Sequence, residues 1–149
     1  MNPSDQPVQV TFKRFDTSLP VPAYATPGAA GIDLVARETH TIPPRKVVLI
    51  PLNIALQIPK NHWVLLAARS SLHKKGVSMA NGIGVGDSDY CGDGDEYRAA
   101  LLNYTDQSVT IERGERIVQM IILPFEKVNL TEVETFGTKD RGGFGSTGK

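Results

Sequence analysis

The residues best suited to do chemistry gather in positions 81–90, which read Asn-Gly-Ile-Gly-Val-Gly-Asp-Ser-Asp-Tyr. Asn81 and Gly82 form a dipeptide typical of a hairpin turn, and the alternating glycines after it would let a ligand lie close to the backbone. Asp87 and Asp89 add two carboxylates, and Tyr90 adds an aromatic ring. The segment is either a ligand-binding hairpin or a flexible acidic one.

Two familiar motifs do not fit this segment. A calcium loop beginning at Asp87 would place Cys91 at its fifth position and Arg98 at its twelfth, where oxygen ligands are needed. A dinucleotide-binding fingerprint requires a helix after the glycines, and no helical periodicity follows them here. The glycines therefore indicate close approach of a ligand or a simple turn, and nothing more specific.

Three further segments carry polar groups beside apolar runs. Ser70 and Ser71 follow an apolar run and Arg69, so they either cap a short helix or bind phosphate together with Arg69 and the helix amides. Asp33 alternates with Ile32 and Leu34, and its simplest interpretation is a strand residue facing solvent. Gln119 lies inside an apolar run, where an unpaired amide would cost about 1–3 kcal/mol, so it needs a partner.

The last segment, residues 139–149, differs from the rest because it is rich in glycine and holds one large apolar side chain, Phe144. It resembles a phosphate-binding loop in spacing, but no Ser or Thr follows Lys149 and no helix follows, so that interpretation fails. Arg141, Ser146 and Thr147 could nevertheless close over an anionic ligand. We expect this segment to be mobile when nothing is bound.

The elements that would position these residues are short strands separated by Pro and Gly. We expect strands at residues 8–12, 32–36, 47–50, 52–58, 63–67, 99–102, 109–111 and 117–123. Residues 70–75, ending at Gly76, are the best helix candidate. The spacing predicts an antiparallel sandwich, jelly roll or barrel, with one β domain over residues 1–138 followed by a tail at 139–149.

Composition excludes several classes of protein. Lys plus Arg and Asp plus Glu each number 16 in 149 residues, so the formal net charge is zero and non-specific nucleic-acid binding is disfavoured. A single cysteine, Cys91, excludes an internal disulfide and makes a Cys-based zinc site very improbable. No apolar run approaches the roughly 20 residues of a membrane span, and the first residues lack a signal-peptide pattern. We expect a soluble, cytoplasmic protein without nucleic-acid or membrane partners.

Taken together and in order, the five segments resemble the five motifs of the trimeric deoxyuridine triphosphate nucleotidohydrolases, the dUTPases. The matching region, residues 30–148, covers about four-fifths of the chain. The resemblance implies a distorted antiparallel β-barrel or jelly roll with one short helix, assembled as a homotrimer with shared active sites. A further strand at residues 128–136, with Pro124 as a hinge, would cross to a neighbouring subunit. The implied reaction is hydrolysis of dUTP to dUMP and pyrophosphate.

The resemblance also implies roles for individual residues. Asp87 would activate the water that attacks the α-phosphorus in line, and Tyr90 would pack under the deoxyribose and exclude a 2′-hydroxyl. Asn81 and the backbone from Ile83 and Gly84 onward would bind uracil.

The remaining implied residues surround the phosphates. Asp33 would hold waters on a Mg²⁺ bound to the triphosphate. Phe144 would stack on uracil, while Arg141 would grip the distal phosphates. The other implied substrate contacts are Arg69, Ser70, Ser71, Gln119, Gly145, Ser146 and Thr147.

Some positions depart from the family pattern. Gly86 stands where a branched residue is usual, Cys91 replaces Arg or Gln, Ser71 replaces a common glycine, and residues 93–98 form a stretch about two residues longer than usual. Two alternatives stay open. One is a dCTP deaminase-type relative, although Ala100 stands where those enzymes carry a catalytic glutamate; the other is a non-catalytic nucleotide-binding trimer.

Overall fold

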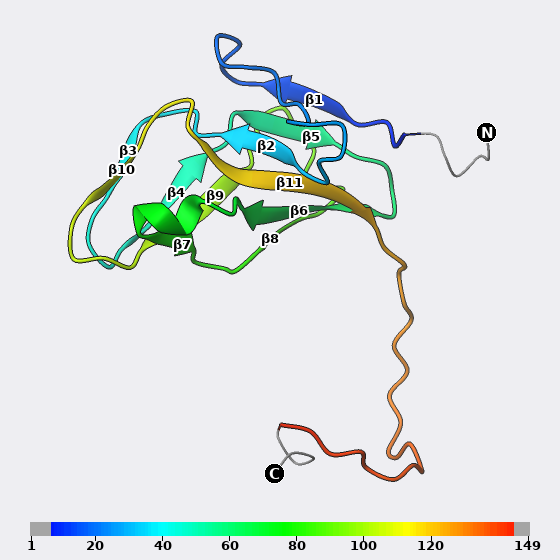
Figure 1. The fold of residues 1–149 in the computed structure, drawn as a ribbon. Helices are drawn as coiled ribbons and strands as arrows, with labels where there is room; N and C mark the ends of the chain where they lie inside the picture. Colours follow the sequence, from blue (N-terminus) through cyan, green and yellow to red (C-terminus); the bar gives the residue numbers. More distant parts are fainter. Residues whose placement is uncertain (1–6, 145–149) are drawn as a thin grey trace.

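The computed structural model describes residues 7–144, and in this part of the chain nearly all regular structure is β-strand (Figure 1). The elements in chain order are β1 (Thr11–Arg14), β2 (Ile32–Val35), β3 (His40–Ile42), β4 (Val47–Pro51), β5 (Ile54–Gln57), β6 (His62–Ala68), the 3₁₀ helix η2 (Leu72–Lys75), β7 (Val77–Met79), β8 (Gly84–Gly86), β9 (Arg98–Asn103), β10 (Val109–Ile111) and β11 (Arg116–Pro124). The expected all-β class with one short helix is confirmed.

The strands pair antiparallel in four small sheets. The largest has the order β2-β11-β6-β8, and a second has the order β4-β9-β7; β1 pairs with β5, and β10 pairs with β3. Many of these neighbours are distant in sequence, as in a jelly roll. The long strand β11 lies between β2 and β6 and sets Gln119 opposite Asp33 on one side and Ala67 on the other.

The core forms from the inward faces of these sheets. In β9 the residues Ala99, Leu101 and Asn103 are buried and alternate with more exposed neighbours, as expected for a strand with one face on the core. In β11 two successive residues, Ile117 and Val118, are both fully buried. The pairing register with β2 shifts between Arg116 and Val118, and such a bulge turns adjacent side chains to the same face.

The sequence located most long strands within one to three residues, but it missed β3, β7 and β8, each three residues long. The local pattern of these three segments is too weak to indicate strands, and tertiary pairing determines them, whereas the equally short β10 was located at residues 109–111. The helix is one 3₁₀ turn that starts at Leu72 and ends at Gly76, whose φ of 78° suits a residue without a β-carbon.

Residues 128–136, expected to form a strand on a neighbouring subunit, form no strand within the single chain. Residues 125–144 contain no strand, and after Phe125, whose N–H donates to the carbonyl of Asn61 at 2.8 Å, the chain leaves the body (Figure 1). A strand needs a partner edge for its backbone hydrogen bonds, and this segment has none among residues 7–144. Within residues 7–144, no helix is long and apolar enough to cross a membrane.

Candidate active site

A pocket of about 330 Å³ lies against the hairpin that contains the Asp and Gly residues. β6 and β8 form one wall, and the stretch before β9 forms the other. Its lining residues are Leu66, Asn81, Gly84, Val85, Gly86, Asp87, Tyr90, Glu96, Tyr97 and Arg98. The structure therefore brings together the predicted residues Asn81, Gly84, Asp87 and Tyr90.

The backbone of the hairpin is arranged to meet a ligand. Gly82 adopts a φ of 72°, and the N–H of Ile83 donates to the carbonyl of Asn81 at 2.8 Å, so the chain turns tightly before β8. Within the described residues, β8 pairs with β6 on one side and forms the edge of the sheet. An edge strand presents unpaired backbone N–H and C=O groups, which can bind the polar edge of a planar base.

Asp87 and Tyr90 stand at the end of this edge strand. The N–H of Tyr90 donates to the carbonyl of Asp87 at 3.2 Å, which closes a turn. The Asp87 side chain is exposed, and no hydrogen bond or ion pair engages it in the part of the chain that the structure describes. A carboxylate in this condition is able to accept a proton from a bound water.

A second group of polar residues lies on the opposite edge of the same sheet. Asp33 on β2 receives a hydrogen bond from Nε of Arg69 to Oδ1 at 2.9 Å and one from Nη1 of Arg116 to Oδ2 at 3.3 Å. The Asp33 side chain is only 15% exposed. The expectation of a solvent-facing strand residue was wrong, because the neighbouring strand β11 and the end of β6 bring two guanidinium groups to this carboxylate.

Gln119 has the partner that its position required. Its Nε2 donates to the carbonyl of Ala68 at 3.2 Å, while its Oε1 lies 2.7 Å from the place where a β-carbon on residue 31 would stand. Gly31 is therefore needed for the close approach of Gln119 to β2. This contact fixes the amide between Asp33 and the segment that begins at Arg69.

Ser70 and Ser71 are both exposed beside this group. Ser71 occupies the position before the first helical residue, but its side chain makes no capping hydrogen bond. The interpretation of Ser71 as a side-chain cap was therefore wrong, and its hydroxyl does not serve η2.

The two groups are separated within one chain. Because the strand order is β2-β11-β6-β8, Asp33 and the edge strand β8 stand three strand spacings apart, or roughly 14 Å. The pocket beside the hairpin is lined by none of the residues Asp33, Arg69 or Gln119. One chain thus presents a pocket at one edge of the sheet and the cluster of Asp33 with Arg69 and Arg116 at the other.

Comparison with known proteins identifies the family of this chain. The dUTPase family model matches residues 17–148. The chain belongs to the dUTPase family. A deoxyuridine 5′-triphosphate nucleotidohydrolase from an Anaeromyxobacter species is 41% identical over an alignment of 149 positions, which covers 96% of this chain and 99% of the relative. A dUTPase structure from Streptococcus mutans superposes with a TM-score of 0.73 at 32% identity, covering 79% of this chain and 98% of that one.

The fold is also shared with a more distant dUTPase. The enzyme of Staphylococcus bacteriophage 80alpha, solved with dUpNHpp, superposes with a TM-score of 0.81 at 24% identity over 95% of this chain and 99% of that one. At this identity the likeness establishes the common dUTPase fold alone.

The two predicted tail residues that the structure describes, Arg141 and Phe144, do not line the pocket. Arg141 and Phe144 are exposed and lie on the C-terminal segment, which runs away from the body (Figure 1). Gly145, Ser146 and Thr147 lie outside the described residues.

Sequence reasoning missed several residues of these two groups. Glu96, Tyr97 and Arg98 line the pocket, and Arg116 contacts Asp33. One signal for Tyr97 was available: Gly86 stands where the family usually has a branched residue, so another side chain had to fill the space.

The donor set fits a magnesium ion that is held mainly by substrate. Among residues 7–144, no three His, Cys, Asp or Glu side chains converge on a point that could hold a metal. Mg²⁺ keeps several waters and commonly binds phosphate oxygens with few direct protein ligands. The single carboxylate of Asp33, beside Arg69 and Arg116, matches such a site.

Proposed function

We propose that this protein hydrolyses dUTP to dUMP and pyrophosphate by in-line attack of a water on the α-phosphorus, with Asp87 as the general base. The observation that carries the proposal is the Asp87 carboxylate, exposed and unpaired within the described residues, at the end of an edge strand and beside a pocket of base size. A base in this position can take the proton of the attacking water as the phosphorus–oxygen bond forms.

Recognition of deoxyuridine would come from the hairpin. The free edge of β8, with Ile83 and Gly84, would bind the polar edge of uracil through backbone groups, and Asn81 would add its amide. The tight turn would exclude a 5-methyl group on the base. The Tyr90 ring would pack under the sugar and exclude a 2′-hydroxyl.

The triphosphate would lie against the second group of residues. Arg69 offers a guanidinium, and the exposed hydroxyls of Ser70 and Ser71 with the amide of Gln119 complete a phosphate-binding wall. Asp33 would hold waters of a Mg²⁺ bound to the phosphates, and the ion would neutralise their charge.

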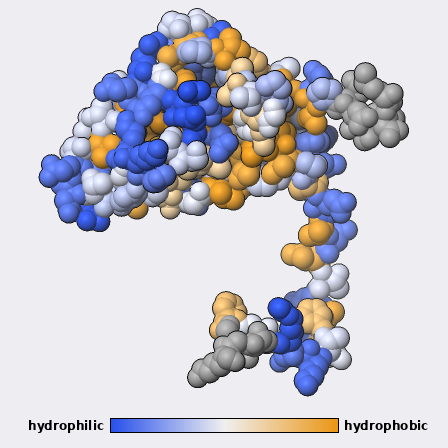
Figure 2. All heavy atoms as spheres, viewed as in Figure 1, coloured by the Kyte–Doolittle hydropathy of each residue, from blue (hydrophilic) through white to orange (hydrophobic). Residues whose placement is uncertain are grey.

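The separation of the two sites supports a homotrimer with shared active sites. A base pocket from one subunit would meet the phosphate wall of another, and the tail of residues 139–149 would close over the bound nucleotide as a lid. Exposed apolar residues continue along the C-terminal segment at Val128, Leu130 and Phe136, and Figure 2 shows apolar surface on the body near its start. Such residues favour burial against another chain. Because dUTP is an intracellular nucleotide, we propose a cytoplasmic location.

Incubation of the protein with dUTP, dCTP, UTP and dTTP, with products separated by chromatography, tests the proposal. Formation of dUMP and pyrophosphate from dUTP alone is expected. Conversion of dCTP to dUTP would instead identify a deaminase, against which Ala100 argues. Saturable dUTP binding without products would identify a non-catalytic nucleotide-binding protein.

A further inference from the structure

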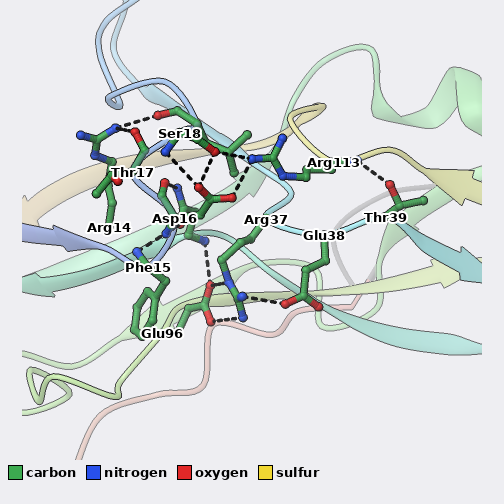
Figure 3. A network of polar contacts seen from close by, with 12 residues as sticks. Arg14, Phe15, Asp16, Thr17, Ser18, Arg37, Glu38, Thr39, Glu96 and Arg113 are labelled. Carbon is green, nitrogen blue, oxygen red and sulfur yellow. Dashed lines mark hydrogen bonds and ion pairs between the residues drawn. The ribbon is translucent and has the colours of Figure 1, made fainter.

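Glu96 is a buried carboxylate in the wall of the base pocket, and none of the roles above uses it. Its side chain is only 5% exposed, and both of its carboxylate oxygens accept hydrogen bonds. Nε and Nη2 of Arg37 donate to Oε1 and Oε2 at 2.8 and 3.0 Å, and the N–H of Asn53 donates to Oε1 at 2.9 Å (Figure 3). A two-pronged guanidinium–carboxylate pair fixes geometry more strictly than a single hydrogen bond.

The main chain of the same residue holds the aromatic ring of the pocket. The hydroxyl of Tyr90 donates to the carbonyl of Glu96 at 3.0 Å. The next residue, Tyr97, packs its ring edge-on against Tyr90, with ring centroids 5.4 Å apart and an interplanar angle of 81°. The carbonyl of Glu96 thus holds the hydroxyl of Tyr90, and the ring of Tyr97 packs against the ring of Tyr90.

Residues 96 and 97 are themselves anchored to the body of the protein. The N–H of Tyr97 donates to the carbonyl of Ile54, and the N–H of Leu52 donates to the carbonyl of Tyr97, each at 2.9 Å. Before them the chain closes a small loop, in which the N–H of Gly92 donates to Oδ2 of Asp95 at 2.7 Å. Residues 93–98, the stretch that is longer than usual in the family, therefore include two residues that are fixed to the body and that contact Tyr90.

We propose that Glu96 is a positioning residue for Tyr90: its ion pair with Arg37 fixes the carbonyl that holds the Tyr90 hydroxyl, and so sets the rejection of ribonucleotides. The inference rests on the proposed function, in which the Tyr90 ring packs under the deoxyribose. A ring held by its far end cannot tilt away from the sugar, and a 2′-hydroxyl then meets a fixed surface. When the anchor is lost, the ring gains freedom and the larger sugar is accommodated.

The measured quantity is the ratio of kcat/KM for dUTP to kcat/KM for UTP. Glu96→Gln keeps the size of the side chain and removes its charge, and we expect the ratio to fall about tenfold, the scale of one well-placed contact in substrate discrimination. Tyr90→Phe removes the hydroxyl without leaving a buried charge, and it should lower the ratio similarly. Arg37→Lys keeps the charge but cannot donate two parallel hydrogen bonds to the carboxylate, and it should give a ratio between those of the wild type and Glu96→Gln.

Arg113→Gln is the matched control. Arg113 donates to Asp16 and Ser18 in the same polar network but does not contact Glu96 or Tyr90. It should lower thermal stability and leave the ratio unchanged, because a partly unfolded enzyme loses both activities in proportion.

Three outcomes overturn the inference: an unchanged ratio in Tyr90→Phe, an unchanged ratio in folded Glu96→Gln, or an equal fall in Arg113→Gln. If Glu96→Gln does not fold, Tyr90→Phe and Arg37→Lys decide the matter. A wild-type protein that does not hydrolyse dUTP would overturn the proposed function instead, so the two failures are distinguishable.

Discussion

The hydroxyl oxygen of Tyr97 lies 2.5 Å from the place where a β-carbon on residue 86 would stand, and two ring carbons lie within 2.9 Å of it. Gly86 and Tyr97 are therefore a complementary pair, in which the ring from the stretch before β9 fills the volume that a side chain on β8 would otherwise occupy. Tyr97 is 4% exposed, and burial raises the pKa of its phenol to about 12.

Gly86→Ala should destabilise the protein by about 1–3 kcal/mol, because a buried aromatic ring must move to admit the methyl group. In a Tyr97→Leu background the same change should cost much less, which gives a favourable coupling energy in a double-mutant cycle. Denaturant unfolding of the four proteins measures it. Gly94→Ala is the control, since a β-carbon there meets nothing within 4 Å. Equal costs of Gly86→Ala in both backgrounds would contradict the pairing.

Asp87→Asn should lower dUTP turnover by at least about 100-fold, the usual scale for removing a general base, and should leave nucleotide affinity nearly intact. Turnover is measured by pyrophosphate release, and affinity is measured by calorimetry with a non-hydrolysable analogue. Asp89→Asn is the matched control in the same turn. Near-normal turnover in Asp87→Asn would move the base elsewhere, with Asp89 or Asp93 next in line.

Acid should weaken the polar network around Asp16. Hydrogen bonds from Ser18 and from the Arg113 guanidinium hold the pKa of the Asp16 carboxyl well below its usual range (Figure 3). A lowered pKa in the folded state means that the ionised form contributes stability above the unfolded-state pKa of about 4, and that this contribution is lost as pH falls below that value towards the folded pKa.

Asp16→Asn should therefore be less stable than the wild type at pH 7, and the difference should shrink as the pH is lowered below about 4. Urea unfolding of both proteins at pH 7 and at a pH below about 4 measures the difference in their free energies of unfolding. Asp106→Asn, which breaks an exposed pair with Arg45, controls for the loss of one surface charge. A difference that grows in acid would contradict the assignment.

The sequence predicted a strand where the apolar pattern of that strand was long enough to recognise. It failed where the strand forms through pairing with residues distant in the chain. The sequence of β9 and β11 contains strand-length apolar runs at residues 99–102 and 117–123, and these runs located both strands. The three residues of β8 contain two glycines and carry no pattern. Their strand exists because they pair with Leu66 and its neighbours on β6, which no local signal reveals.

The candidate site divides in the same way. The family motifs pointed to Asp87 and Tyr90, and the structure places both beside one pocket. The pairing of Asp33 with Arg69 and Arg116 depends on the register of β11 between two strands, so the isolated pattern around Asp33 gave the wrong environment. Glu96 was missed because its partner Arg37 lies 59 residues away in the chain.

Deletion of residues 141–149 should lower turnover by about 100-fold, the scale of losing groups that orient a substrate. Thermal stability should change little, since Arg141 and Phe144 are exposed and surface changes usually alter stability by less than about 0.5 kcal/mol. Within the full chain, Phe144→Ala should lower turnover, and Phe144→Trp should largely preserve it because stacking on the base is retained. Full turnover by the truncated protein would remove Arg141 and Phe144 from the site.

Complementation between inactive variants tests the shared sites. If Asp87 and the lid of one active site come from different subunits, trimers reassembled from equal amounts of Asp87→Asn and the 141–149 truncation contain some intact sites. Half of the subunits supply a normal Asp87 and the other half supply a normal tail, so about one quarter of sites should be complete.

Activity near one quarter of wild type, appearing only after the two variants are unfolded and refolded together, is the expected result. Light scattering should give the mass of three chains for each variant, because neither change touches the β body. Mixing two samples of the same variant is the control and should restore nothing. No recovery in the co-refolded trimers, or full wild-type activity in a monomer, would mean that each chain carries a complete site and that the roughly 14 Å between Asp33 and β8 is spanned within one subunit.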